Sequence, residues 1–134
     1  DGELWVVAPG GGAPVRLDRA SNPGPCSWPK WAPVVDDYFD GKILWLTFSS
    51  YRAYGLRLAP KERTQLWMVG FDPQKAAAGQ DPSLPAFWLP FQDITSGNRI
   101  AQWVTKVARQ SCSTDVDCPG GERCDNGVCL PRIN

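Results

Sequence analysis

The stretch "DGKILWLTFSS", residues 40–50, decides the fold that we predict for this chain. An Asp-Gly pair opens a run rich in β-branched, aromatic and other apolar residues, a pattern typical of a β-strand that leaves a turn. Successive residues of a strand point to opposite faces, and here both faces are mostly apolar. We therefore expect a strand that is covered on both sides.

The Leu-Trp pair of this stretch occurs twice more, in "DGELWVV" (1–7) and "TQLWMVG" (64–70). Each of these is followed by a turn and a further apolar run, "VRL" (15–17) after the first and "AFWLPFQDI" (86–94) after the second. Pro90 interrupts the longer run, which predicts an edge strand or a bulge because proline donates no hydrogen bond to a sheet. The two phrases therefore mark corresponding strands of a repeated unit.

A second pair of matching segments, "PKWAP" (29–33) and "IAQWV" (100–104), follows the last run of each set. We interpret the chain as the end of one repeat, one whole repeat of short antiparallel strands, and the start of another. Thirteen glycines and thirteen prolines punctuate the sequence and leave no room for a long helix. We read the helix-friendly "KAAAGQ" (75–80) as a loop turn. Residues 98–110 could form a strand followed by a linker or a short helix, and we favour a strand at their start.

The composition excludes several classes of function. Fourteen basic and fourteen acidic side chains give zero formal charge, and no basic run indicates nucleic acid or an anionic membrane surface. No apolar stretch reaches the ~20 residues of a membrane-spanning helix. The absence of histidine removes Ser-His-Asp and Cys-His catalysis and imidazole metal sites within these residues. The chain starts with Asp and has no signal-peptide pattern, so we expect a processed product or the C-terminal part of a longer protein.

The cysteines are unevenly placed. Four of the five lie close together near the end of the sequence: Cys112, Cys118, Cys124 and Cys129. Such density in a loop-rich segment predicts an extracytoplasmic protein, whether periplasmic, associated with the outer membrane or secreted. The wide spacing favours disulfides over zinc, which usually takes closer cysteine pairs. Cys26 stands alone, and we expect burial or a bridge to a cysteine outside the chain rather than a reactive thiol.

The ordered series of motifs resembles the blades of TolB-like β-propellers, the PD40 or WD40-like group. Residues 29–33 are similar to the opening of a blade, 43–49 to its second strand and 66–69 to its third, while "GAPVRL" (12–17) is similar to the end of the preceding blade. The resemblance implies an all-β fold with about one and a half propeller blades of four antiparallel strands across residues 1–108.

Residues 109–134 resemble the small EB or Dickkopf-type cysteine-rich modules of secreted and bacterial surface proteins. The resemblance rests on "CSTDVDCPGGERCDNGVCLP" (112–131), and it implies two disulfides. Four cysteines allow three pairings, of which we favour the interlaced one, Cys112–Cys124 with Cys118–Cys129. A module this small cannot bury a useful core, so the bridges must hold it together.

The candidate binding residues are Tyr51, Arg52 and Tyr54, because surface loops carry function more often than strands do. They belong to a larger set of aromatic side chains that could stack on a sugar or a peptide. The aromatic members of this set are Trp28, Trp31, Tyr38, Tyr51, Tyr54 and Trp88. The alternative for such aromatics is packing between blades, which we expect for Trp5, Trp45 and Trp67.

An acidic cluster in the tail could hold calcium: Asp115, Asp117, Asp125 and Asn126. The EF-hand spacing is absent, however, and these residue types are ordinary in turns. We therefore expect no catalytic residue, no metal and no cofactor in this chain.

The resemblance to TolB-like propellers implies a non-catalytic binding or scaffold role in protein–protein interaction at a cell envelope. The partner would be another protein or the remainder of the same propeller, and we expect no enzyme. One alternative is the propeller of a prolyl-oligopeptidase-like peptidase, although the chain has no G-x-S-x-G nucleophile motif. The other is a carbohydrate-binding, sialidase-like propeller, since "DGELW" (1–5) is similar to the Asp-box turn of that class.

Overall fold

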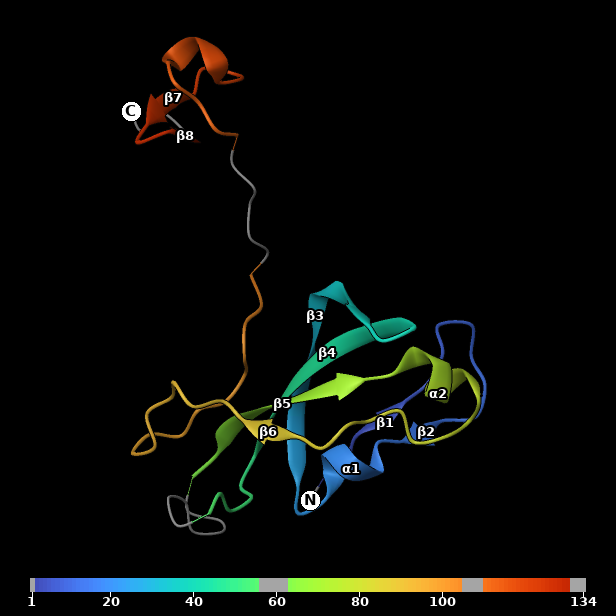
Figure 1. The fold of residues 1–134 in the computed structure, drawn as a ribbon. Helices are drawn as coiled ribbons and strands as arrows, with labels where there is room; N and C mark the ends of the chain where they lie inside the picture. The colour runs from blue at the N-terminus through green and yellow to red at the C-terminus, as the bar shows by residue number, and fades with distance from the viewer. Residues whose placement is uncertain (1, 56–62, 105–109, 131–134) are drawn as a thin grey trace. The chain divides into compact units, whose positions relative to one another are not determined.

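The computed structural model describes residues 2–55, 63–104 and 110–130 (Figure 1). The chain divides into two compact units, residues 1–104 and 105–134, which we call the sheet unit and the tail module. The boundary expected between residues 108 and 109 lies outside the described residues. No helix in the described ranges is both long enough and apolar enough to cross a membrane.

The sheet unit consists mostly of antiparallel strands. Its elements are β1 (Trp5–Val6), β2 (Val15–Arg16), α1 (Asp18–Ser21), β3 (Cys26–Tyr38), β4 (Gly41–Ser50), β5 (Gln65–Phe71), α2 (Pro73–Ala77) and β6 (Phe87–Trp88). β1 pairs with β2, and a separate four-stranded sheet has the order β3-β4-β5-β6, with β4 and β5 at its centre (Figure 1). The expected antiparallel four-stranded sheet of consecutive strands is thus confirmed, and "DGKILWLTFSS" supplies its longest central strand.

β3 forms one edge of this sheet and is irregular for a chemical reason. Its register with β4 shifts between Ser27 and Lys30 and again between Trp31 and Val35. Each shifted segment contains a proline, Pro29 or Pro33, which has no N–H to donate to the ladder. An edge interrupted in this way is a poor template for an added strand.

The last strand is much shorter than the apolar run 86–94 predicts, because β6 ends at Trp88. Pro90 cannot donate a ladder hydrogen bond, and a side chain takes over at this point. The amide of Gln92 accepts a hydrogen bond from the Leu66 N–H and donates one to the Leu66 carbonyl, both at 2.7 Å. The Gln92 side chain therefore satisfies the edge of β5 where a backbone strand was expected.

One face of the four-stranded sheet carries the core. Residues that pair directly across antiparallel strands share a face, and Leu46 pairs with Val69 as Phe48 does with Trp67. Leu4, just before β1, and Leu17, just after β2, belong to the same core, and Val6 of β1 packs against it. The core members with at most 6% of their surface exposed are Leu4, Leu17, Ala20, Cys26, Leu46, Phe48, Trp67, Val69, Phe71 and Trp88.

Trp5 does not share this core, contrary to expectation. Its neighbour Leu4 is 5% exposed, and Val6 packs against the core from the same strand. Because side chains alternate along a strand, Trp5 points away and keeps 56% of its surface exposed. Trp67, by contrast, is 5% exposed, and Trp45 is half-buried on the opposite face of the sheet.

That opposite face is covered only in part. The Trp45 ring packs edge-on against Phe87 at 6.3 Å between centroids. The Trp103 indole N–H donates to Thr47 Oγ1 at 3.1 Å. Residues 98–104 form no strand, so the prediction of a strand at the start of residues 98–110 is wrong. Trp103 contacts the sheet through its side chain instead.

A short helix replaces the loop turn expected around residues 75–80. In α2, Asp72 is the N-cap and its carboxylate accepts hydrogen bonds from the backbone N–H of Gln74 and Lys75, at 2.9 and 3.3 Å. Pro73 occupies the first turn, where its missing N–H costs nothing. The Asp-Pro pair before the alanines is therefore a helix-start signal.

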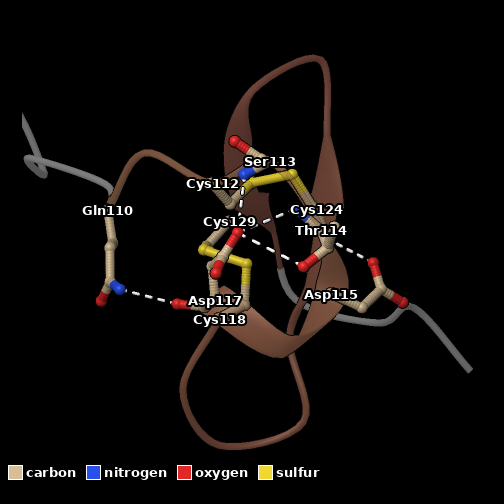
Figure 2. Close-up of a disulfide and its surroundings, with 9 residues drawn as sticks. All are labelled: Gln110, Cys112, Ser113, Thr114, Asp115, Asp117, Cys118, Cys124 and Cys129. Carbon is tan, nitrogen blue, oxygen red and sulfur yellow. Dashed lines mark hydrogen bonds between the residues drawn. A yellow bond between two sulfur atoms is a disulfide. The ribbon is translucent and has the colours of Figure 1, made fainter.

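The tail module contains η1 (Asp115–Asp117), β7 (Arg123–Asp125) and β8 (Val128–Leu130). β7 and β8 form a hairpin whose turn residues Asn126 and Gly127 have φ angles of 50° and 79°. A two-residue turn with both φ angles positive suits Asn-Gly and matches the twist of the strands. Two disulfides close the module (Figure 2).

The disulfides join Cys112 to Cys124 and Cys118 to Cys129, with Cα–Cα distances of 5.8 and 5.5 Å. This is the interlaced pairing favoured from the sequence. Cys112 also donates its N–H to the Gly127 carbonyl, and Cys129 donates to the Gln110 carbonyl. Bridges and backbone bonds thus attach the hairpin to the segment before η1.

Candidate functional site

A cleft of about 650 Å³ lies where the loop that follows β4 meets α1 and the segment before β6. Its lining combines two cations, one carboxylate and aromatic or small apolar side chains. The lining includes Asp18, Arg19, Arg52, Tyr54, Trp67 and Ala86. The cleft therefore contains two of the three candidate binding residues, Arg52 and Tyr54.

Tyr54 forms an aromatic wall with two tryptophans of the sheet. Its ring stacks on Trp88 at 4.9 Å with an interplanar angle of 25°, and meets Trp67 edge-on at 5.8 Å. Pairs of this kind contribute about 0.5–1.5 kcal/mol beyond simple burial. Tyr54 nevertheless remains 41% exposed, so it is fixed in place and still accessible to a ligand.

Arg52 is not an exposed loop residue, which corrects the expectation for this position. Only 6% of its surface is accessible. Its Nε donates to Ser50 Oγ at 3.1 Å, and its Nη2 donates to the Ala20 carbonyl at 2.7 Å. The rings of Phe48 and Trp67 each lie 5.0 Å from the guanidinium carbon. Two aromatic rings and two oxygen acceptors thus hold the guanidinium of this cleft residue in place.

The charge of Arg52 has no carboxylate partner among the described residues. Burial lowers the pKa of Arg52, and the nearby Cys26 opposes that shift. Arginine nevertheless stays protonated at physiological pH. Removing an ion from water costs several kcal/mol, which the cation–π contacts offset by about 2 kcal/mol or more. A positive charge is therefore held rigidly beside the cleft.

Cys26 contributes a thiol to the same cluster. Its Sγ accepts a hydrogen bond from Arg52 Nη2 at 3.0 Å, and the residue is 5% exposed. Burial raises the pKa of the Cys26 thiol, and the attraction of Arg52 offsets only part of this rise. The group is consequently a protonated, buried thiol at neutral pH.

The other candidate side chains do not line this cleft. Tyr51 is half-buried, and Trp88, at 6% exposed, contributes by stacking on Tyr54. Trp28, Trp31 and Tyr38 lie on β3 and are between 37% and 56% exposed.

Asp115 and Asp117 of the tail bind backbone groups of the module (Figure 2). Asp117 accepts hydrogen bonds from the N–H of Ser113 and Thr114, at 2.8 and 2.9 Å, and these bonds lower the pKa of its carboxyl. Asp115 accepts from the Cys124 N–H at 2.8 Å. These two members of the calcium candidate thus have structural partners, and the four tail sulfurs are bonded in disulfides.

Comparison of the chain with protein-family models, with curated proteins and with solved structures finds no match. The resemblance to TolB-like propellers therefore stays a hypothesis carried by the residues themselves.

Proposed function

We propose that this chain is part of an extracytoplasmic β-propeller and that it serves as a non-catalytic scaffold for a protein partner. One observation carries the proposal: the β1–β2 sheet lies against one face of the β3–β6 sheet through a shared apolar core. Stacked antiparallel four-stranded sheets are the building principle of propellers. On this proposal β1 and β2 are the last two strands of one blade, and β3 to β6 are the next blade.

The opposite face of the four-stranded sheet supports the same proposal. Trp45, Met68 and Phe87 lie there, and Phe87 keeps 42% of its surface exposed. A sheet with apolar residues on both faces needs a neighbour on each side. A following blade would supply that neighbour and cover these side chains.

The binding role is supported by where accessible side chains sit on this framework. Tyr54 is held by stacking on the sheet and opens to the cleft. Rigid strands that present loop residues are the usual basis of recognition in propellers and related folds. The two tail disulfides are consistent with an oxidising compartment.

Site-specific crosslinking tests the protein-binding role. In the full-length protein, Tyr54 is replaced by the photo-crosslinker p-benzoylphenylalanine and the producing cells are irradiated. We expect one discrete protein adduct, which mass spectrometry identifies and purified components reproduce. The matched control places the same group at Phe39, which is 89% exposed at the β3–β4 turn and should give no such adduct.

Two further assays separate this proposal from its alternatives. Labelling of the full-length protein by a serine-hydrolase activity probe would instead favour the peptidase propeller. Saturable binding on a glycan array, together with no protein adduct at position 54, would favour the carbohydrate-binding propeller. We expect neither result.

A further inference from the structure

We infer that the cleft beside Tyr54 is a binding site for a single carboxylate group, which Arg52 recognises, and that the carboxylate is the C-terminal one of a peptide ending in an apolar residue. The part of this inference that names a protein partner rests on the proposed function. The recognition of a carboxylate by Arg52 does not rest on it, because a small molecule can test that recognition.

The first support is the hydrogen bonding of Arg52. Nε and Nη2 of the guanidinium have partners, whereas Nη1 has none among the described residues. Among the described residues, the enclosed side-chain atoms without a partner are Arg16 Nε, Ser49 Oγ, Trp67 Nε1 and Trp88 Nε1. Arg52 Nη1 is not one of them, so this atom is not fully enclosed, and Arg52 lines the cleft. The residue as a whole is only 6% exposed, but this one nitrogen of the cation can donate to a ligand that enters the cleft.

The second support is preorganisation. Contacts with Phe48, Trp67, Ser50 and Ala20 fix the guanidinium before any ligand arrives. Charge-assisted hydrogen bonds from arginine to carboxylates are strong. The binding free energy is more favourable still when the arginine side chain is already ordered, because binding then costs less conformational entropy. A carboxylate in the cleft would also supply the counter-charge that the described residues do not provide.

The charge of the lining favours an anion. The guanidiniums of Arg19 and Arg52 line the cleft without a salt bridge to any described residue, whereas the Asp18 carboxylate in the same lining is already paired with Arg16. An anion in the cleft therefore meets positive charge beside an apolar wall. A carboxylate that carries an apolar group satisfies both, whereas inorganic phosphate would leave the wall uncovered.

The remaining walls select what the carboxylate is attached to. Tyr54, Trp67, Ala86 and the prolines Pro23 and Pro85 give the cleft an apolar and aromatic side. A C-terminal residue places its carboxylate next to its own side chain, so that one ligand reaches both the guanidinium and this wall. A polyhydroxylated sugar acid would place hydroxyl groups against the same apolar surface, where they lose hydrogen bonds.

The test uses N-acetylphenylalanine as the probe, with N-acetylphenylalaninamide as the uncharged match. Each is titrated into the 134-residue chain while the side-chain nitrogen signals of Arg52 are followed by NMR. We expect a saturable shift of these signals with the acid and at least about tenfold weaker binding of the amide, since the charge-assisted bonds are lost. Inorganic phosphate and N-acetylneuraminic acid should also bind more weakly than the acid.

Three variants sharpen the test. Arg52→Lys keeps the charge but loses the planar fork of donors, and should weaken binding by about tenfold. Tyr54→Ala removes the exposed wall but leaves every hydrogen bond of Arg52 in place, and should weaken binding several-fold. Arg99→Gln removes an exposed arginine away from the cleft and should change nothing. Tryptophan fluorescence checks that each variant is folded.

Several results would overturn the inference. Equal binding of the acid and the amide would show that the carboxylate is not recognised. The absence of any shift in the Arg52 signals of the unsubstituted chain on addition of the acid would also overturn the inference, and this result does not depend on whether Arg52→Lys folds. Tighter binding of N-acetylneuraminic acid would replace the peptide with a sugar acid. If the NMR titration succeeds and crosslinking at position 54 fails, the protein-binding role falls while the carboxylate site stands.

Discussion

The sheet unit and the tail module are stabilised by opposite means. The sheet unit packs large side chains such as Phe48 and Val69, at 1% and 0% exposed, between two layers of strands. In the described part of the tail, residues 110–130, the one buried side chain is Cys129, and it is itself bonded in a disulfide. One short chain thus relies on a hydrophobic core in one unit and on covalent links in the other.

The two units can be followed separately because of where the tryptophans lie. All seven fall within residues 1–104, so tryptophan fluorescence reports on the sheet unit alone. Amide hydrogen exchange in β7 and β8 reports on the tail. A substitution in one unit can therefore be tested for its effect on the stability of the other.

The largest effect is expected from Phe48→Ala. Phe48 is 1% exposed, lies in the middle of the core and flanks the Arg52 guanidinium. Removing its ring should lower the free energy of unfolding of the sheet unit by about 3–5 kcal/mol, measured by urea denaturation with tryptophan fluorescence. Phe91→Ala, at a residue 82% exposed, is the control and should stay within about 0.5 kcal/mol of the parent.

Exchange of the tail amides should be the same in Phe48→Ala as in the parent chain. A tail that loses protection when Phe48 is truncated would show that the two units depend on each other, against the comparison made here.

The next effect is expected from removing one bridge with the double substitution Cys118→Ala and Cys129→Ala. These cysteines are 11 residues apart, and loss of a native disulfide from a small module costs about 2–5 kcal/mol. The tail has almost no core to compensate, so protection of the β7 and β8 amides should be lost. Since Cys26 is a free thiol, the parent for this experiment carries Cys26→Ala to prevent exchange of disulfides.

The fluorescence transition of the sheet unit should remain where it is in that parent. A shifted midpoint would contradict the independence of the units, and full amide protection without the bridge would contradict the covalent account of the tail.

The same contrast explains which features of the structure can be predicted from the sequence. Patterns that depend on local chemistry were readable: the apolar run 40–50 became β4, and the spacing of the tail cysteines indicated two bridges. Local signals were also missed in places. Asp72-Pro73 starts α2, and Asn126-Gly127 forms the tail hairpin turn, although both are short sequence signatures with a known physical basis.

The candidate site was much less accessible to sequence reasoning. Tyr54 could be proposed as a loop aromatic, but the burial of Arg52 could not, because its partners come from distant positions. Ala20 and Cys26 are 32 and 26 residues away from it in sequence. Ala20 reaches Arg52 from α1, and Cys26 reaches it because β3 pairs with β4 with Cys26 opposite Ser50. No local sequence pattern encodes either arrangement.

The smallest effect is expected from acid, and it tests one carboxylate in each unit. In the sheet unit, Asp81 accepts hydrogen bonds from the N–H groups of Arg19 and Ser83, at 3.1 and 3.0 Å. Burial by itself would raise the pKa of Asp81, but the hydrogen bonds from Ser83 and Arg19 outweigh it and lower the pKa below its ordinary value. In the tail, the bonds from Ser113 and Thr114 lower the pKa of Asp117.

A carboxyl whose pKa is lower in the folded state stabilises that state above its unfolded pKa, which is about 3.9 for Asp. The stabilisation is lost as the pH falls through the folded pKa. Asp81→Asn should therefore lower the stability of the sheet unit near pH 7 by at most about 1 kcal/mol and flatten its fluorescence-monitored decline below pH 4. Asp117→Asn should flatten the acid dependence of amide exchange in the tail and leave the fluorescence of the sheet unit unchanged. The disulfides of the tail do not break in acid, whereas α1 is held by non-covalent contacts. We therefore expect the stability of the tail to fall less steeply with falling pH than the stability of the sheet unit. A steeper fall in the tail would contradict the different stabilisation of the two units.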